Sequence, residues 1–186
     1  MKMFLLSTLL LAATAGAFAQ GKKAAPPPFM IMIPDLKDGA DLPTKFSCSN
    51  APSGVSPKIE WMNAPAGTQS FAILLHDPEP HPQKSIYDVT HWFIYNIPGT
   101  ATSLAEGVQN GAMADGTKHL KNIRGFDGYF GPCAPPGLNH HYTFELYALD
   151  TKLDLAADAT RADAMKALDG HILGSAVFVT LFKRAQ

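Results

Sequence analysis

Short apolar runs, each bounded by Pro, Gly, Asp or Asn, recur along the chain and predict β-strands. Runs of strand length occupy residues 29–33, 59–62, 71–75, 91–97 and 176–182. Residues 142–149 differ, because apolar and more polar side chains alternate there. Successive side chains of a strand point to opposite faces, so this alternation predicts a strand with one buried face and one wetter face.

One segment near the C-terminus has the pattern of a helix. Thr160 can cap a helix, and Asp163 follows at the spacing of a capping box. The apolar positions that would share one face of this helix are Ala164, Met165 and Leu168. Asp169-Gly170 is typical of a helix end. Several strands and a single late helix favour a mainly β, mostly antiparallel architecture in which the helix covers a sheet.

The N-terminus has the features of an export signal. A charged start precedes an apolar stretch over residues 4–18, and Ala17-Phe18-Ala19 supplies the small residues of a cleavage site. The stretch is shorter than the roughly 20 apolar residues that a membrane-spanning helix needs. We therefore expect a periplasmic or secreted protein with a signal peptide at 1–19, a flexible Pro-rich leader at 20–28 and one folded domain at 29–186.

Charge and cysteine content narrow the possible functions. The 186 residues carry 15 Lys and Arg against 16 Asp and Glu, a formal net charge of −1, which disfavours a nucleic-acid partner. Cys48 and Cys133 make an even count in a chain sent to an oxidising compartment, which favours one disulfide. Two buried free thiols remain the alternative. A metal site is disfavoured, since no Cys-x-x-Cys is present and neither cysteine has a His at ligand spacing.

Polar segments lie at the ends of three predicted strands. Asp77 follows the strand 71–75 in a Pro-rich loop, and His91 opens the next strand. Residues 128–137 form a Gly- and Pro-rich loop that leads through His140 into the alternating strand. Each segment alone is typical of an ordinary turn. Together, in a chain otherwise sparing with charge, they favour one shared binding site, and the loop could turn backbone N–H groups toward an anion.

These motifs also resemble a known family, the phosphatidylethanolamine-binding proteins, and most closely its bacterial, Raf-kinase-inhibitor-like branch. The motifs that carry the resemblance are Asp77-Pro-Glu-Pro80, Thr90-His-Trp-Phe-Ile-Tyr-Asn-Ile-Pro98, Gly131-Pro-Cys-Ala-Pro-Pro-Gly137 and His140-His-Tyr142. The likeness extends over residues 29–182. It implies a large antiparallel sheet packed with a smaller sheet, and a small pocket for phosphate-like or acetate-like anions.

The resemblance assigns roles to individual residues. The side chains that it places in the pocket are Asp77, His91, His140, the aromatic Tyr142 and the second acid Glu79, with Pro136 and Gly137 in the wall loop. Two features depart from the family pattern: the second acid is Glu where Asp is more common, and a longer segment after it carries His81. The motif assigns nothing to His76, which we take as a strand-end histidine facing solvent.

We expect Asp77 and His91 to interact. An ionised Asp77 would accept a hydrogen bond from one ring nitrogen of His91 and leave the other nitrogen free to donate to a ligand. The nearby carboxylate would raise the pKa of His91, so anion binding should weaken as pH rises.

An Asp and a His could also belong to a hydrolase, but the sequence contains no nucleophile elbow, no His-Glu-x-x-His and no phosphate-binding Gly-rich loop. Nothing marks Ser85 or Ser103 as activated. We therefore expect a non-catalytic anion-binding protein without cofactor or metal. An inhibitor of a protease or other enzyme, a weak hydrolase, a protein partner and a homodimer are left open as alternatives.

Overall fold

The structure is a computed structural model that describes residues 25–50 and 52–186. The predicted signal peptide, 1–19, and the first part of the predicted leader lie outside the described residues. Residues 25–28 are exposed and form no regular secondary structure. Among the residues that the structure describes, no helix has the length and apolar character needed to cross a membrane.

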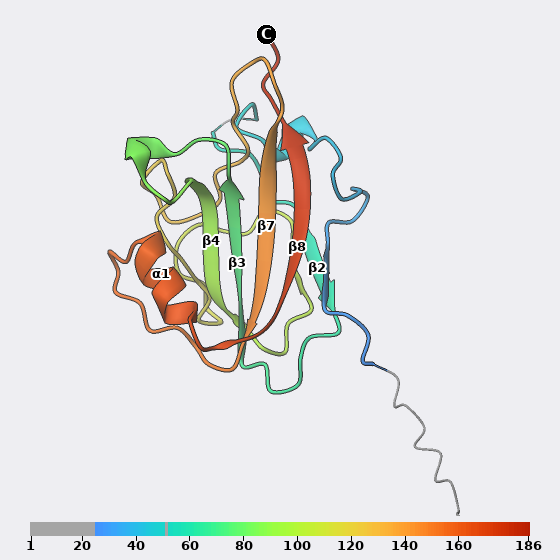
Figure 1. The fold of residues 1–186 in the computed structure, drawn as a ribbon, viewed down its shortest axis with the longest axis vertical. Coiled ribbons are helices and arrows are strands. Elements are labelled where there is room, and N and C mark those ends of the chain that lie inside the picture. Colours follow the sequence, from blue (N-terminus) through green and yellow to red (C-terminus); the bar gives the residue numbers. More distant parts are fainter. Residues whose placement is uncertain (1–24, 51) are drawn as a thin grey trace, which may run out of the picture.

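The larger of two antiparallel sheets has five strands in the order β6-β4-β3-β7-β8 (Figure 1). Its strands are β3 (Ser70–Asp77), β4 (Val89–Pro98), β6 (Lys118–His119), β7 (His140–Leu149) and β8 (Ile172–Phe182). The smaller sheet contains β1 (Met30–Met32), β2 (Ile59–Met62) and β5 (Ser103–Leu104), in the order β1-β2-β5. The predicted mainly β fold, with a large sheet, a small sheet and one late helix, is confirmed.

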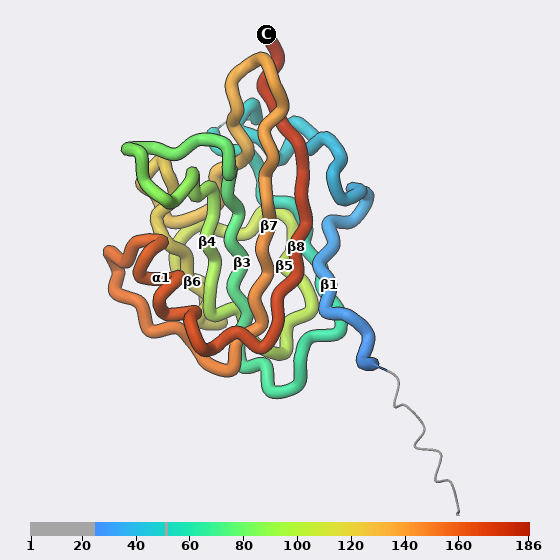
Figure 2. Tube along the Cα trace, viewed as in Figure 1, coloured from blue at the N-terminus to red at the C-terminus, as the bar shows by residue number. Residues whose placement is uncertain are grey.

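The strand predictions missed only the shortest elements of the described sheets. β5 and β6 have two residues each, which is too short for any apolar periodicity to appear. Two 3-10 turns, η1 (Thr44–Phe46) and η2 (Pro82–Lys84), lie in the connections. The tube in Figure 2 shows the segment before η1 following the outer edge of β8, where Gly39 N donates to Val179 O at 2.8 Å. This segment shields part of an edge strand that could otherwise pair with another chain.

One face of the large sheet is buried, and α1 covers part of the other face. One face of β7, formed by Tyr142, Phe144, Leu146 and Ala148, is buried in the core that includes β1 and β2. On the opposite face, α1 (Arg161–Leu168) lies beside β4, and its buried Ala164 and Leu168 pack with side chains of β3 and β4 (Figure 1). The predicted capping box of Thr160 and Asp163 is present. Alternation in β7 thus gives one buried face and one half-buried face with Thr143, Glu145 and Tyr147, as the sequence predicted.

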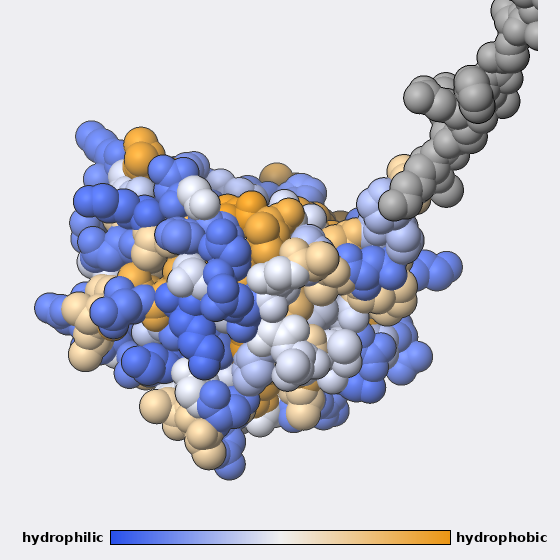
Figure 3. Space-filling model, turned by 90° about the horizontal axis from the view of Figure 1, so that it is seen from below, coloured by the Kyte–Doolittle hydropathy of each residue, from blue (hydrophilic) through white to orange (hydrophobic). Residues whose placement is uncertain are grey.

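The two ends of the large sheet differ. One end collects the last residue of β3 and the first residues of β4 and β7, and the C-terminal tail leaves from the same end (Figure 1). Hydrophilic side chains cover much of the other end, seen in Figure 3, where β8 begins with the exposed Ile172 and Leu173. The candidate site lies at the first of these ends.

Candidate functional site

Antiparallel pairing brings the predicted site residues to one end of the sheet. Asp77 is the last residue of β3 and pairs with Val89, the first residue of β4, while His76 beside it pairs with Thr143 near the start of β7. His140 opens β7, and His91 is the third residue of β4. Residues 63 positions apart in the sequence can therefore form a direct contact.

Asp77 and His140 form a hydrogen-bonded pair. The Nδ1 atom of His140 lies 2.8 Å from Oδ2 of Asp77, whose side chain is only 4% exposed. The second carboxylate oxygen, Oδ1, accepts a hydrogen bond from the backbone N–H of Glu79 at 3.2 Å. Asp77 thereby fixes the orientation of the His140 ring, and no hydrogen bond in the described part of the chain occupies the Nε2 atom of that ring.

Glu79 extends this pair into a four-residue network. Its Oε1 lies 2.6 Å from Nδ1 of His141 and also accepts from the backbone N–H of His141. Burial and a hydrogen bond to Glu79 raise the pKa of Asp77. Burial would raise the pKa of Glu79 as well, but its hydrogen bonds to Asp77 and His141 outweigh burial and lower it. Glu79 is the more acidic of the two carboxyl groups.

His91 is not part of this pair, and the predicted contact between Asp77 and His91 is wrong. The ladder pairs Leu75 with Trp92 and His76 with Thr90, so His91 is the extra residue of a β-bulge. Its Nδ1 lies 2.9 Å from the carbonyl oxygen of Phe130 and 3.1 Å from that of Gly131. The bulge residue His91 thus bonds to the loop after residue 128, and its Nδ1 is not available to Asp77.

The predicted rise in the pKa of His91 is also wrong. Burial lowers the pKa of His91 to about 4, although the carbonyl groups of Phe130 and Gly131 partly oppose this shift. Because carbonyl oxygens only accept hydrogen bonds, Nδ1 carries the proton of the neutral ring. Near neutral pH the Nε2 atom of His91 is therefore a hydrogen-bond acceptor, and no hydrogen bond within the described residues occupies it.

Tyr142 joins the histidines to the loop after residue 128. Its ring meets the edge of the His91 ring at a centroid distance of 5.1 Å, and its hydroxyl accepts from the backbone N–H of Cys133 at 3.0 Å. Burial and the charge of Asp77 raise the pKa of Tyr142, so the side chain stays a neutral hydroxyl. Tyr142 and His140 are two residues apart on β7 and share one face of the sheet.

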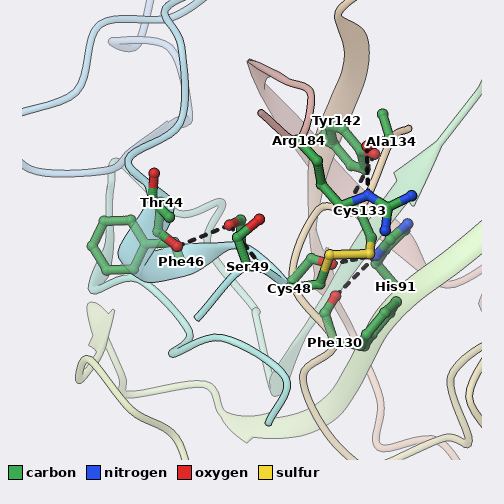
Figure 4. The surroundings of a disulfide bond; sticks show 12 residues. Thr44, Phe46, Cys48, Ser49, His91, Phe130, Cys133, Ala134, Tyr142 and Arg184 are labelled. Carbon is green, nitrogen blue, oxygen red and sulfur yellow. Dashed lines mark hydrogen bonds between the residues drawn. A yellow bond between two sulfur atoms is a disulfide. The ribbon is translucent and has the colours of Figure 1, made fainter. Parts of the chain in front are cut away.

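A disulfide holds this loop in place, as the close-up in Figure 4 shows. Cys48 and Cys133 are bonded, with their Cα atoms 5.3 Å apart, so the predicted pairing is confirmed. The backbone N–H of Cys48 also donates to the carbonyl oxygen of Pro132 at 3.0 Å. Gly131 packs so closely on the backbone of Phe46 and Ser47 that a Cβ atom would collide with it, which explains a glycine there.

Pro136 and Gly137 lie farther along the same loop and are exposed. Gly137 has a φ of +133°, a conformation that favours glycine. Several clefts elsewhere on the described surface have volumes of about 260–670 Å³ and are lined by other residues. The concavity expected around the site, and the part of Pro136 and Gly137 in it, stay predictions.

His76 does not face solvent, so that expectation is wrong. Strand alternation turns it to the face opposite Asp77, where its Nδ1 lies 2.6 Å from Oδ2 of Asp88 and its Nε2 lies 3.5 Å from Oε1 of Glu145. Arg161 of α1 also binds Asp88. Burial lowers the pKa of His76, but the two carboxylates outweigh it and raise the pKa to about 9. Sequence analysis missed this ion cluster because its members lie on four separate segments.

The acid network also has the composition of a metal site. Single ligand atoms of Asp77, Glu79 and His140 all lie within 4.8 Å of one another, and carboxylate oxygens with an imidazole nitrogen suit several divalent metals. The same groups, however, already form hydrogen bonds with one another and with backbone N–H groups. The geometry does not require a cation, and the absence of a metal stays a prediction.

Comparison with known proteins decides the family. The family model described as phosphatidylethanolamine-binding protein matches residues 33–183. The chain belongs to this family. A UPF0098 protein of Methanothermobacter thermautotrophicus is 39% identical over 150 residues, which are 80% of this chain and 95% of that protein.

Two further relatives place the chain more closely. A Mycobacterium tuberculosis protein named as a candidate lipoprotein, LppC, is 36% identical over 157 residues, 84% of this chain and 73% of that protein. The crystal structure of E. coli YbcL, described as a new member of the mammalian family, aligns with a TM-score of 0.73 at 26% identity and covers 86% of this chain and 100% of that chain. The resemblance drawn from the motifs, including the bacterial branch, is confirmed.

Proposed function

We propose that this chain is a non-catalytic binding protein for small phosphate-like or carboxylate anions, held where β3, β4 and β7 meet. The observation that carries the proposal is the gathering of His91, His140 and Tyr142 on one face of the sheet, with His140 oriented by Asp77 at 2.8 Å. The Nε2 atom of each histidine has no hydrogen-bond partner among the described residues. The Nε2 of His91 is an acceptor, and the Nε2 of His140 is one further polar atom of the site. Membership of a family known for an anion-binding pocket supports the same function.

The tautomer of His91 favours one kind of anion over the other. Its unprotonated Nε2 needs a donor, and a hydrogen phosphate or phosphate monoester that retains a P–OH group supplies one. A carboxylate such as acetate carries no proton near pH 7 and leaves this nitrogen without a partner. Within the proposed class, phosphate-like ligands should therefore bind more tightly than carboxylates.

The structure offers a matched pair of variants for the test. His171 forms the same kind of contact as His140, with Nδ1 2.8 Å from Oδ1 of Asp150, at the opposite end of β7. Calorimetric titration with inorganic phosphate and with acetate at pH 7 should show His140→Gln binding phosphate about tenfold more weakly, the value of one charge-assisted hydrogen bond. His171→Gln should bind as wild type does. Undetectable binding by wild type, or equal losses in both variants, would overturn the proposal.

The non-catalytic part of the proposal is tested separately. The hydroxyl of Ser85 accepts from the backbone N–H of Tyr87 within its own loop, and Ser103 lies in the small sheet, so neither serine is paired with His91 or His140 among the described contacts. A screen with ester, phosphoester and peptide substrates should show no turnover. Turnover abolished by His140→Gln would show an enzyme, and specific capture of a protein from periplasmic extract would point to an inhibitor.

We also propose that the protein acts outside the cytoplasm. A relative named as a candidate lipoprotein, the signal-peptide pattern at residues 1–19 and the Cys48–Cys133 disulfide support this location. Disulfides persist in oxidising compartments and are rare in the cytosol. Fractionation of expressing cells should place the mature protein, shortened by the signal peptide, in the periplasm or the medium.

A further inference from the structure

The proposed anion site contains acidic side chains but, among the residues described so far, no permanent positive charge. Asp77 and Glu79 bring two acidic side chains to it, and His91 is buried and bonded to backbone carbonyl groups. An anion beside two carboxyl groups needs a cation near it, because like charges at this distance repel. The networks described so far do not supply a permanent positive charge at this end of the sheet.

Arg184 lies in the right place to supply that charge. The ladder between β7 and β8 pairs His140 with Phe182, so Arg184 follows two residues after the position opposite His140. Its backbone N–H donates to the carbonyl oxygen of Ala134 at 3.1 Å, and its side-chain Nε donates to the same oxygen at 3.3 Å. These two bonds hold the start of the guanidinium group against the disulfide-bonded loop.

In Figure 4 the Arg184 side chain lies beside Ala134 and Cys133. The backbone N–H of Cys133 donates to the Tyr142 hydroxyl. Arg184 forms no salt bridge with any residue that the structure describes, and its two terminal guanidinium nitrogens have no hydrogen-bond partner there. Arg161, in contrast, is committed to Asp88, and Arg124 stacks on the ring of Phe130 at 5.6 Å. Of these three arginines, Arg184 is thus the one whose two terminal guanidinium nitrogens are free to donate to a ligand.

We propose that Arg184 is a further anion-binding residue, whose terminal guanidinium nitrogens bind the oxygens of a phosphate-like ligand held by His140 and Tyr142. The inference rests on the proposed anion-binding function and adds the tail after β8 to the site. A guanidinium group presents two parallel N–H donors that match two phosphate oxygens, which a lysine cannot do. The Nε bond to Ala134 fixes the plane of this donor pair before the ligand arrives.

Three variants test the proposal by calorimetric titration with inorganic phosphate at pH 7. Arg184→Gln should bind about tenfold more weakly, as expected for loss of a charge-assisted contact. Arg184→Lys should recover only part of this loss. Arg184 and Lys183 are both exposed, but only the Arg184 side chain is bonded to the disulfide-bonded loop, so Lys183→Gln, which removes the same charge, should bind within about twofold of wild type.

A second measurement separates binding from folding. The backbone bond from residue 184 to Ala134 survives every substitution, so thermal unfolding of the three variants should match wild type. The affinity of wild type should fall more steeply with salt than that of Arg184→Gln. Phosphate binding that is equal in wild type and Arg184→Gln would overturn the role of Arg184 alone. Absence of phosphate binding in wild type would overturn both this inference and the proposed function.

Discussion

His76 and Asp77 are adjacent residues with separate surroundings. Because a strand alternates its side chains, Asp77 points toward His140 and Tyr142 while His76 points under α1 toward Asp88. The first side chain belongs to the candidate site, and the second belongs to an ion cluster that joins α1 to the sheet through Arg161. Substitutions at these two neighbours should therefore have different effects.

His76→Gln should lower the free energy of unfolding by roughly 2 kcal/mol at pH 7, because Asp88 and Glu145 each lose a charged partner. The figure lies below the range for fully buried pairs, since the side chain of His76 keeps 11% exposure. The pKa of about 9 in the folded protein exceeds the ordinary 6.5, so this stabilisation is complete below pH 6.5 and is lost as pH rises through 9.

Urea unfolding of wild type and His76→Gln at pH 6 and pH 10 measures this difference. The two proteins should differ most at pH 6 and little at pH 10. A difference independent of pH would mean that His76 contributes by packing and not by charge. Phosphate affinity should be unchanged in His76→Gln, because the ion cluster and the candidate site lie on opposite faces of the sheet.

A second test at the scale of single residues asks whether Asp77, Glu79 and His140 hold a metal ion. The carboxylate oxygens of Asp77 and Glu79 already accept hydrogen bonds from His140, His141 and backbone N–H groups, so we expect no tightly held ion. Dialysis against EDTA should change neither phosphate affinity nor the thermal unfolding temperature. Stoichiometric metal in the purified protein, with binding lost on chelation and restored by that metal, would show that the three side chains bind a cation.

At the scale of elements, the loop that carries Cys133 connects most parts of the site. It provides the carbonyl groups of Phe130 and Gly131 to His91, the N–H of Cys133 to Tyr142 and the carbonyl of Ala134 to the tail. The disulfide ties this loop to the segment after η1, 85 residues away in the sequence. The geometry of the site should therefore depend on an intact disulfide.

Replacing Cys48 and Cys133 together by Ser should lower the free energy of unfolding by about 2–5 kcal/mol, the usual cost of losing a native disulfide. Phosphate should also bind more weakly, because the loop no longer holds its acceptors and donors in fixed positions. Urea unfolding and calorimetry measure the two effects. In the wild-type protein, alkylation after unfolding without reductant should add no mass, whereas two added alkyl groups would show free thiols.

At the scale of the whole molecule, buried neutral histidines set the response to acid. Burial lowers the pKa of both His91 and His119 to about 4. His119 also accepts from the indole N–H of Trp92, which requires its Nδ1 to be unprotonated. The two residues lie in different parts of the large sheet, on β4 and β6. Protonation of either one must place a charge inside the fold.

The free energy of unfolding should therefore fall between pH 6.5 and pH 4. A histidine whose folded pKa lies below its unfolded value contributes stability above pH 6.5 and loses it as pH falls through 4. Each histidine accounts for at most about 3 kcal/mol of this loss. Urea titrations of wild type and His119→Gln at pH 7 and pH 4 measure the effect, and the variant should lose less stability over this interval. Equal losses would show that other groups govern acid unfolding.

The sequence by itself determined the elements and the family. Apolar runs located the longer strands, the alternation in residues 142–149 predicted which side chains enter the core, and the pattern around Thr160 and Asp163 predicted the helix. These features depend on short-range periodicity, which is visible in the sequence. The ordered motifs identified the family because their spacing reflects the whole fold.

Only the tertiary structure decided which polar groups meet. A single extra residue in β4 turned His91 toward the carbonyl groups of Phe130 and Gly131 and left Asp77 to His140, which no sequence spacing reveals. Burial then lowered the pKa of His91, where a carboxylate partner would have raised it. Register, burial and the contact of the C-terminal tail with Ala134 depend on long-range packing, and they fix the charge and the hydrogen-bonding role of each group in the site.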